Sequence, residues 1–199
     1  MSTAETVLEL VRDRRMVRPR DLEAAGISPT HLQRLYEQGM IERSSRGVYL
    51  PLDAPLDPHQ TLAEVALRVP SGIVCLLSAL QFHQFTTQSP HQVWLALPPR
   101  THRPQLDSVS LRLFQMSGPL LTEGIEAHEL GGASVRITSP ARTVADCFKF
   151  RNKIGLDIAL EALTDGWRRR KFTMDEVWRY GKLCRVSNIM RPYLETLSL

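Results

Sequence analysis

The sequence predicts an α+β protein in two parts, a small helical domain that ends in a β-hairpin and a larger mixed domain. Two observations support this. Within the first fifty residues, three short helix patterns precede two strand patterns around a basic turn that contains glycine. Farther along, period-two segments alternate with helix patterns, as in a small β-sheet packed by helices. The predicted domains are residues 1–52 and 58–199, and a linker with Pro51, Pro55 and Pro58 joins them.

The first three helices are predicted from their start and stop signals. Ser2 and Glu5 have the spacing of a capping box, which begins the first helix. Pro19 suits the first position of a second helix that stops at Gly26, and Ser28 fits the N-cap of a third helix that Gly39 ends. In the third helix, the residues expected to form one buried face are Leu32, Leu35 and Tyr36.

A hairpin follows these helices directly. Residues 40–43 and 48–50 have strand patterns, and the turn between them is Ser44-Ser45-Arg46-Gly47. Two helices joined by a short turn and followed by a hairpin form a winged helix-turn-helix, whose second helix enters the major groove of double-stranded DNA. Helix pairs with this spacing also occur in proteins that never bind DNA. The arginines of the hairpin favour the DNA-binding interpretation.

The predicted DNA contacts lie on the third helix and on the segments that flank it. Hydroxyl, amide, imidazole and guanidinium groups at these positions can bond to bases or phosphates. The net charge of residues 1–50 is only 8 − 7 = +1. Contact must therefore depend on where the cations are placed. The candidate DNA-binding residues are Arg18, Arg20, Ser28, Thr30, His31, Gln33, Arg34, Arg43 and Arg46.

Composition narrows the class of protein. Of the 199 residues, 43% are hydrophobic and 23% are charged, as in an ordinary globular protein. No apolar run approaches the length that spans a bilayer, and the N-terminus does not resemble a signal sequence, so we expect a cytoplasmic location without membrane contact. Cys75, Cys147 and Cys184 are far apart, and the six histidines show no metal-ligand spacing. We expect reduced, buried thiols, no metal and no cofactor.

The second domain is predicted as a small sheet packed by helices. Its predicted helices start near Asp57, Ser139 and Thr173, with two more over about 155–166 and 188–197. Residues 73–82 are predicted as a buried strand turn or a helix, with Ser78-Ala79-Leu80 inside the helix. Its predicted strands cover residues 92–97, 110–116, 125–130 and 133–137, with Gly131-Gly132 as the turn between the last two.

The C-terminal third carries most of the positive charge, 12 − 7 = +5 for residues 141–199. Three interpretations stay open for this surface: a solvated loop, a clamp on the DNA backbone, or a site for an acidic partner. A clamp would make DNA affinity fall steeply with salt. The candidate residues are Arg168, Arg169, Arg170, Lys171, Arg179, Lys182 and Arg185.

Enzyme signatures are weak. The sequence has no glycine-rich phosphate loop, no nucleophile elbow and no paired carboxylates, so we expect no catalytic residue. Arg142 and Asp146 are spaced to pair along one helical turn. An arginine near a helix start opposes the helix dipole, which suggests that Arg142 also contacts a carbonyl or carboxylate elsewhere. A buried tie between helix and sheet is favoured over catalysis.

Several stretches, in order over residues 5–165, resemble the AbiEi-type antitoxin family of bacterial abortive-infection systems. The segments are Arg46-Gly47-Val48-Tyr49, residues 72–80 with His83 and Thr86, residues 90–96, residues 139–146 and residues 158–163. The resemblance implies a transcriptional regulator whose winged helix binds its own promoter DNA and represses it. It also implies a second domain that counteracts a cognate toxin, typically a nucleotidyltransferase-like protein.

The residues leave other functions open. The chain could be a stand-alone winged-helix regulator, or a protein-interaction module in which the helix-turn-helix docks a protein and the basic C-terminus is the functional surface. Deletion of residues 1–50 would separate these alternatives. The sequence does not give the operator, the toxin or the oligomeric state.

Overall fold

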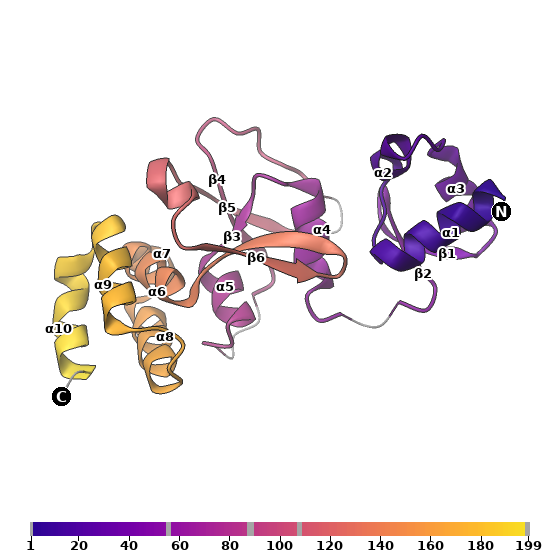
Figure 1. Ribbon diagram of the computed structural model, residues 1–199. Helices are drawn as coiled ribbons and strands as arrows, with labels where there is room; N and C mark the ends of the chain where they lie inside the picture. Colours follow the sequence, from indigo (N-terminus) through magenta and orange to yellow (C-terminus); the bar gives the residue numbers. More distant parts are fainter. Residues whose placement is uncertain (1, 55–56, 87–89, 107–108, 198–199) are drawn as a thin grey trace. The chain divides into compact units, whose positions relative to one another are not determined.

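A computed structural model describes residues 2–54, 57–86, 90–106 and 109–197 (Figure 1). The chain divides into two compact units. Unit 1 comprises Met1–Arg68 with Leu106–Val109 and Glu129–Ser134, and unit 2 comprises Val69–Gln105, Ser110–His128 and Val135–Leu199. Helices and strands follow the predicted order, so the predicted α+β class is confirmed. Unit 1 runs past the linker predicted at 51–58, of which residues 55 and 56 lie outside the described residues.

Unit 1 has the predicted winged helix-turn-helix. Its elements are α1 (Thr3–Arg14), α2 (Pro19–Ala24), α3 (Thr30–Glu37), β1 (Ile41–Ser45), β2 (Val48–Pro51) and α4 (Gln60–Arg68). Ser2 and Glu5 form the predicted capping box. Val17 and Tyr49 form an antiparallel bridge that joins the chain after α1 to the wing. The core of this unit consists of Val7, Val11, Val17, Leu22, Leu32, Leu35, Ile41 and Tyr49.

Two predictions for α3 were wrong. The N-cap residue is Pro29 and not Ser28, whose hydroxyl instead shares a 2.8 Å hydrogen bond with the hydroxyl of Thr30. Tyr36 is 41% exposed and not buried. In a two-turn helix the buried stripe is narrow, and Tyr36 lies at its edge, where its ring meets Tyr49 edge-on.

Unit 2 contains most of a five-stranded sheet in the order β5-β4-β3-β7-β6. The strands are β3 (Ile73–Val74), β4 (Val93–Leu97), β5 (Leu111–Gln115), β6 (Ile125–Leu130) and β7 (Ala133–Thr138). Strand β3 is antiparallel to β4 and parallel to β7, while β4 and β5 are parallel. All five residues of β4 are buried, as expected for a central strand.

Helices pack in a layer beside this sheet (Figure 1). They are α5 (Leu76–Phe82), α6 (Pro140–Lys149), α7 (Arg151–Ile154), α8 (Leu156–Arg168), α9 (Met174–Leu183) and α10 (Ser187–Leu197); a 3-10 turn, η1, covers Gly118–Leu121. Helix α6 is the centre of the layer, and Val144 and Phe148 are fully buried in the core. The sequence did not predict η1 or α7. No described helix is long and apolar enough to cross a bilayer.

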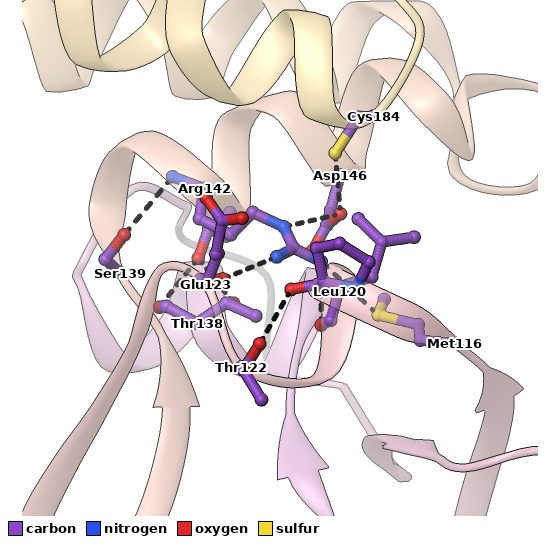
Figure 2. A network of polar contacts seen from close by, with 11 residues as sticks. Met116, Leu120, Thr122, Glu123, Thr138, Ser139, Arg142, Asp146 and Cys184 are labelled. Carbon is purple, nitrogen blue, oxygen red and sulfur yellow. Dashed lines mark hydrogen bonds and ion pairs between the residues drawn. The ribbon is translucent and has the colours of Figure 1, made fainter.

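A fully buried ion pair fixes α6 (Figure 2). Arg142 Nε lies 3.1 Å from Asp146 Oδ1, and both side chains are completely inaccessible to solvent. The guanidinium also donates to the carbonyls of Glu123, at 2.7 Å, and Leu120, at 3.2 Å. The thiol of Cys184, at the end of α9, donates to the same carboxylate oxygen. The expected contact between Arg142 and a carbonyl is confirmed, and the pair joins α6 to the 120–123 loop and to α9.

Burial affects the ionisation of this cluster. It raises the pKa of Asp146, although the charge and hydrogen bond of Arg142 act in the opposite direction. The pKa of Cys184 rises to about 12 through burial and the nearby Asp146. The three cysteines are free and buried, as predicted. Their thiols therefore stay protonated at neutral pH.

Candidate DNA interface

Helix α3 presents one polar, solvent-facing side. Leu32 and Leu35 fix its orientation by packing into the core of unit 1. Thr30, Gln33 and Arg34 are exposed, and His31 is half-buried. Since residues three and four apart share a helix face, Arg34 lies on the same face as Thr30 and beside His31. The structure thus brings together the four predicted groups of the recognition helix.

Within the described part of the chain, the side chains of His31 and Arg34 make no hydrogen bond or ion pair, whereas Gln33 is engaged. Its Nε2 donates to Glu37 Oε1 at 2.8 Å, and its Oε1 accepts from the hydroxyl of Tyr49 at 3.3 Å. Among the described residues, Arg34 is therefore a cation without a bonded partner on this face. Gln33 is held between its own helix and strand β2 of the wing.

The wing carries two exposed arginines. Gly47 closes the turn at a φ of 75°, which favours glycine. The hairpin register shifts between Arg43 and Ser45, a β-bulge that twists the strand beside the turn. Arg43 Nε donates to the Ser45 carbonyl at 3.3 Å. The Arg46 guanidinium makes no hydrogen bond or ion pair to any residue that the structure describes, so it is available at the tip.

The wing turn is bonded to α4 within unit 1. The hydroxyl of Ser44 donates to Glu64 at 3.2 Å, and Arg68 donates to the hydroxyl of Ser45 at 3.1 Å and to the carbonyl of Arg46. These bonds restrain the backbone of the turn and leave the Arg46 side chain outside. The sequence did not predict this role for Glu64 and Arg68. Their i,i+4 spacing was visible, but their partner lies about twenty residues away.

The two arginines at the start of α2 are occupied by unit 1 itself. Arg18 pairs with Asp21 at 3.1 Å and donates to the carbonyl of Leu67, and Arg20 donates to the same carbonyl at 3.2 Å. Burial raises the pKa of Asp21, but hydrogen bonds from Arg18 and the charges of Arg18 and Arg20 outweigh it, so the pKa lies below its ordinary value. These arginines are structural in the free protein.

The second basic surface lies on unit 2 at the ends of α8 and α9. All seven predicted side chains are exposed: Arg168, Arg169, Arg170, Lys171, Arg179, Lys182 and Arg185. Arg169 donates to the backbone and side-chain oxygens of Gln84, and Arg179 contacts the ring of Tyr180. Among the residues that the structure describes, no three His, Cys, Asp or Glu side chains gather into a metal-binding group.

Comparison with known proteins assigns the first part of the chain. Residues 5–51 match the family model described as transcriptional regulator, AbiEi antitoxin. The matched segment contains α1 from its third residue, the helix-turn-helix and the wing, and it ends at the last residue of β2. The predicted resemblance to AbiEi-type antitoxins is thus confirmed over this segment.

Structural comparison supports the fold of nearly the whole chain. The crystal structure of the RV2827C protein from Mycobacterium tuberculosis is similar, with a TM-score of 0.56 over 90% of this chain and 71% of that one. The two sequences are 17% identical, so the similarity concerns the fold alone. Comparison with curated proteins gives no match.

Proposed function

We propose that this chain is an antitoxin that binds its own promoter DNA and represses transcription. The observation that carries the proposal is that the family match and the winged helix-turn-helix cover the same segment. The segment that matches a family of antitoxin regulators is the one that folds as a winged helix-turn-helix with free arginines on α3 and at the wing tip. In this fold the second helix reads the major groove, and the wing holds phosphates or the minor groove.

The contacts divide the candidate residues into three groups. Arg34, with His31 and Thr30, is assigned to the bases, because these side chains share the solvent-facing side of α3. Arg43 and Arg46 are assigned to the DNA backbone or the minor groove. Ser28, Gln33, Arg18 and Arg20 would support these contacts through the hydrogen bonds that they make within unit 1.

The proposed toxin is a nucleotidyltransferase-like protein, and unit 2 is proposed to counteract it. This part of the proposal rests on the resemblance of residues 72–163 to AbiEi-type antitoxins. The matched family segment ends at residue 51, so the alternative is a stand-alone winged-helix regulator. Either function is one of binding and not of catalysis.

A pair of experiments tests the two halves separately. A gel shift with DNA from upstream of the gene is expected to show binding that an unrelated fragment of equal length does not compete away. Co-expression with a nucleotidyltransferase-like gene from the same operon is expected to restore growth. DNA binding without growth rescue would support the stand-alone regulator, and no sequence-specific binding would refute the promoter assignment.

A further inference from the structure

The basic segment between α8 and α9 is a fixed part of the fold. Helix α8 ends in a Schellman motif, in which Arg170 N–H donates to the Trp167 carbonyl and Lys171 N–H to the Gly166 carbonyl. Two residues later, Thr173 and Glu176 form the capping box of α9. Between these ends Phe172 is buried against Gly166, where any Cβ would overlap the phenyl ring. The backbone that carries the cations of this segment is therefore held in one conformation.

This segment lines a cavity of about 780 Å³ that is open to solvent, with a volume within the size range of small-molecule sites. Its lining is made by the end of α8, the connecting segment and the first turn of α9. The lining residues are Trp167, Arg168, Arg170, Lys171, Phe172, Thr173, Met174 and Glu176. Three of these eight residues are aromatic or otherwise apolar, and three are cations.

The charge in the cavity is unbalanced. In the part of the chain that the structure describes, Arg168, Arg170 and Lys171 make no side-chain hydrogen bond or ion pair. The one carboxylate among the described lining residues is Glu176, which already accepts from the backbone N–H of Thr173 at 2.7 Å and from its hydroxyl at 2.9 Å. Three unpaired cations therefore face a site whose only acid is occupied, which favours an anionic occupant.

The aromatic side chains of the cavity favour an anion that also carries a ring. The indole of Trp167 packs partly against the core of unit 2, and its remaining surface lines the cavity, where an inorganic phosphate would make no use of it. A base stacks on an aromatic side chain while guanidinium groups bind the attached phosphates. We propose that this cavity binds a nucleoside phosphate, with the base against Trp167 and the phosphates at Arg168, Arg170 and Lys171. The ligand is either a free nucleotide or the phosphorylated end of a nucleic acid strand.

The fold provides a matched control for this proposal. Helix α9 also ends in a Schellman motif, with Arg185 N–H bonded to the Lys182 carbonyl. Arg170 and Arg185 occupy equivalent positions, with φ values of 52° and 59°, and both side chains are exposed. Arg170 lines the cavity and Arg185 does not. Substituting either one removes one charge from the same backbone environment.

The test is calorimetric titration of the full chain with adenosine triphosphate, guanosine triphosphate, adenosine, inorganic phosphate and a 5′-phosphorylated single-stranded oligonucleotide. A triphosphate is expected to bind about tenfold or more tightly than adenosine or inorganic phosphate. Arg170→Gln should weaken this binding about tenfold, since a charge-assisted hydrogen bond is lost, and Arg185→Gln should leave it nearly unchanged. Trp167→Leu should weaken a nucleotide but not inorganic phosphate.

Several results would overturn the proposal: no binding of either triphosphate or of the oligonucleotide, equal weakening by Arg170→Gln and Arg185→Gln, or inorganic phosphate binding as tightly as the triphosphate. Binding of the oligonucleotide alone would identify a strand end as the source of the same chemistry. Thermal denaturation of each variant shows whether it is folded. Because Arg34→Ala should leave nucleotide affinity unchanged, failure of promoter binding and failure of this proposal are distinguishable.

Discussion

The hydroxyl of Tyr49 donates a hydrogen bond to the side-chain oxygen of Gln33, so that strand β2 of the wing is bonded to the helix proposed to enter the major groove. The amide of Gln33 also donates to Glu37. A contact between Gln33 and a base would require these bonds to be exchanged. The geometry therefore favours Gln33 as a residue that positions α3 against the wing.

Removal of the Tyr49 hydroxyl tests this relationship. Tyr49→Phe keeps the buried ring and is expected to lower the free energy of unfolding by about 0.5–1.5 kcal/mol, the usual net value of one hydrogen bond. Affinity for promoter DNA should fall modestly, because α3 loses a restraint. Urea unfolding and a DNA titration measure the two effects. Tyr36→Phe is the control, and an equal effect of both variants would contradict the positioning role.

The buried pair Arg142–Asp146 of α6 predicts that the free energy of unfolding depends strongly on both side chains. Arg142→Ala leaves Asp146 buried without its cation and is expected to lower the free energy of unfolding by about 3–5 kcal/mol. The double variant Arg142→Met with Asp146→Leu removes both charges and should be less destabilised than the single variant. Urea unfolding compares them. If the double variant were less stable than Arg142→Ala, the uncompensated charge of Asp146 would not be the main cause of the destabilisation.

The burial of His83 predicts that the stability of the protein depends on pH. Burial lowers its pKa below the ordinary 6.5, although the hydrogen bond from its Nε2 to the Thr138 carbonyl opposes this effect. Between the two pKa values the unfolded chain binds the proton and the folded chain does not. Stability is therefore complete above pH 6.5 and is lost as the pH falls through the lower, folded value.

His83→Gln should flatten this part of the stability curve. The measurement is the midpoint of urea unfolding across the acid side of pH 6.5, with the exposed His91→Gln as the control. If the wild-type protein and His83→Gln lose stability in parallel over this range, His83 does not cause the dependence.

The sequence predicted the elements of unit 1 well because their ends are marked by strong local signals. Gly26 and Gly39 follow α2 and α3 at positive φ, and Pro19 begins α2. It predicted the end of α8 less well because Arg170 occupies the corresponding left-handed position, which sequence rules reserve mainly for glycine. Here tertiary packing, with Phe172 against Gly166, replaces the local preference.

The candidate DNA interface was predicted in composition but not in its internal bonds. The residue types of α3 and the wing indicated which side chains could reach DNA. Which of them are free was only partly predictable. Arg18 and Gln33 each have one partner within four residues, Asp21 and Glu37, but their other partners, Leu67 and Tyr49, are distant in sequence. The sequence indicated the buried environment of Arg142 only indirectly, because an arginine near a helix start opposes the helix dipole and needs another partner.

A titration of promoter DNA by fluorescence anisotropy tests the central claim most directly. We expect Arg34→Ala to weaken specific binding by about 1–3 kcal/mol and to relax the sequence preference, as for an arginine that reads a base. Arg46→Ala should weaken binding to all sequences and reduce the salt dependence. The exposed Arg12→Ala, on α1, is the control. If Arg34→Ala keeps wild-type affinity and sequence preference, α3 does not read DNA and the account is wrong.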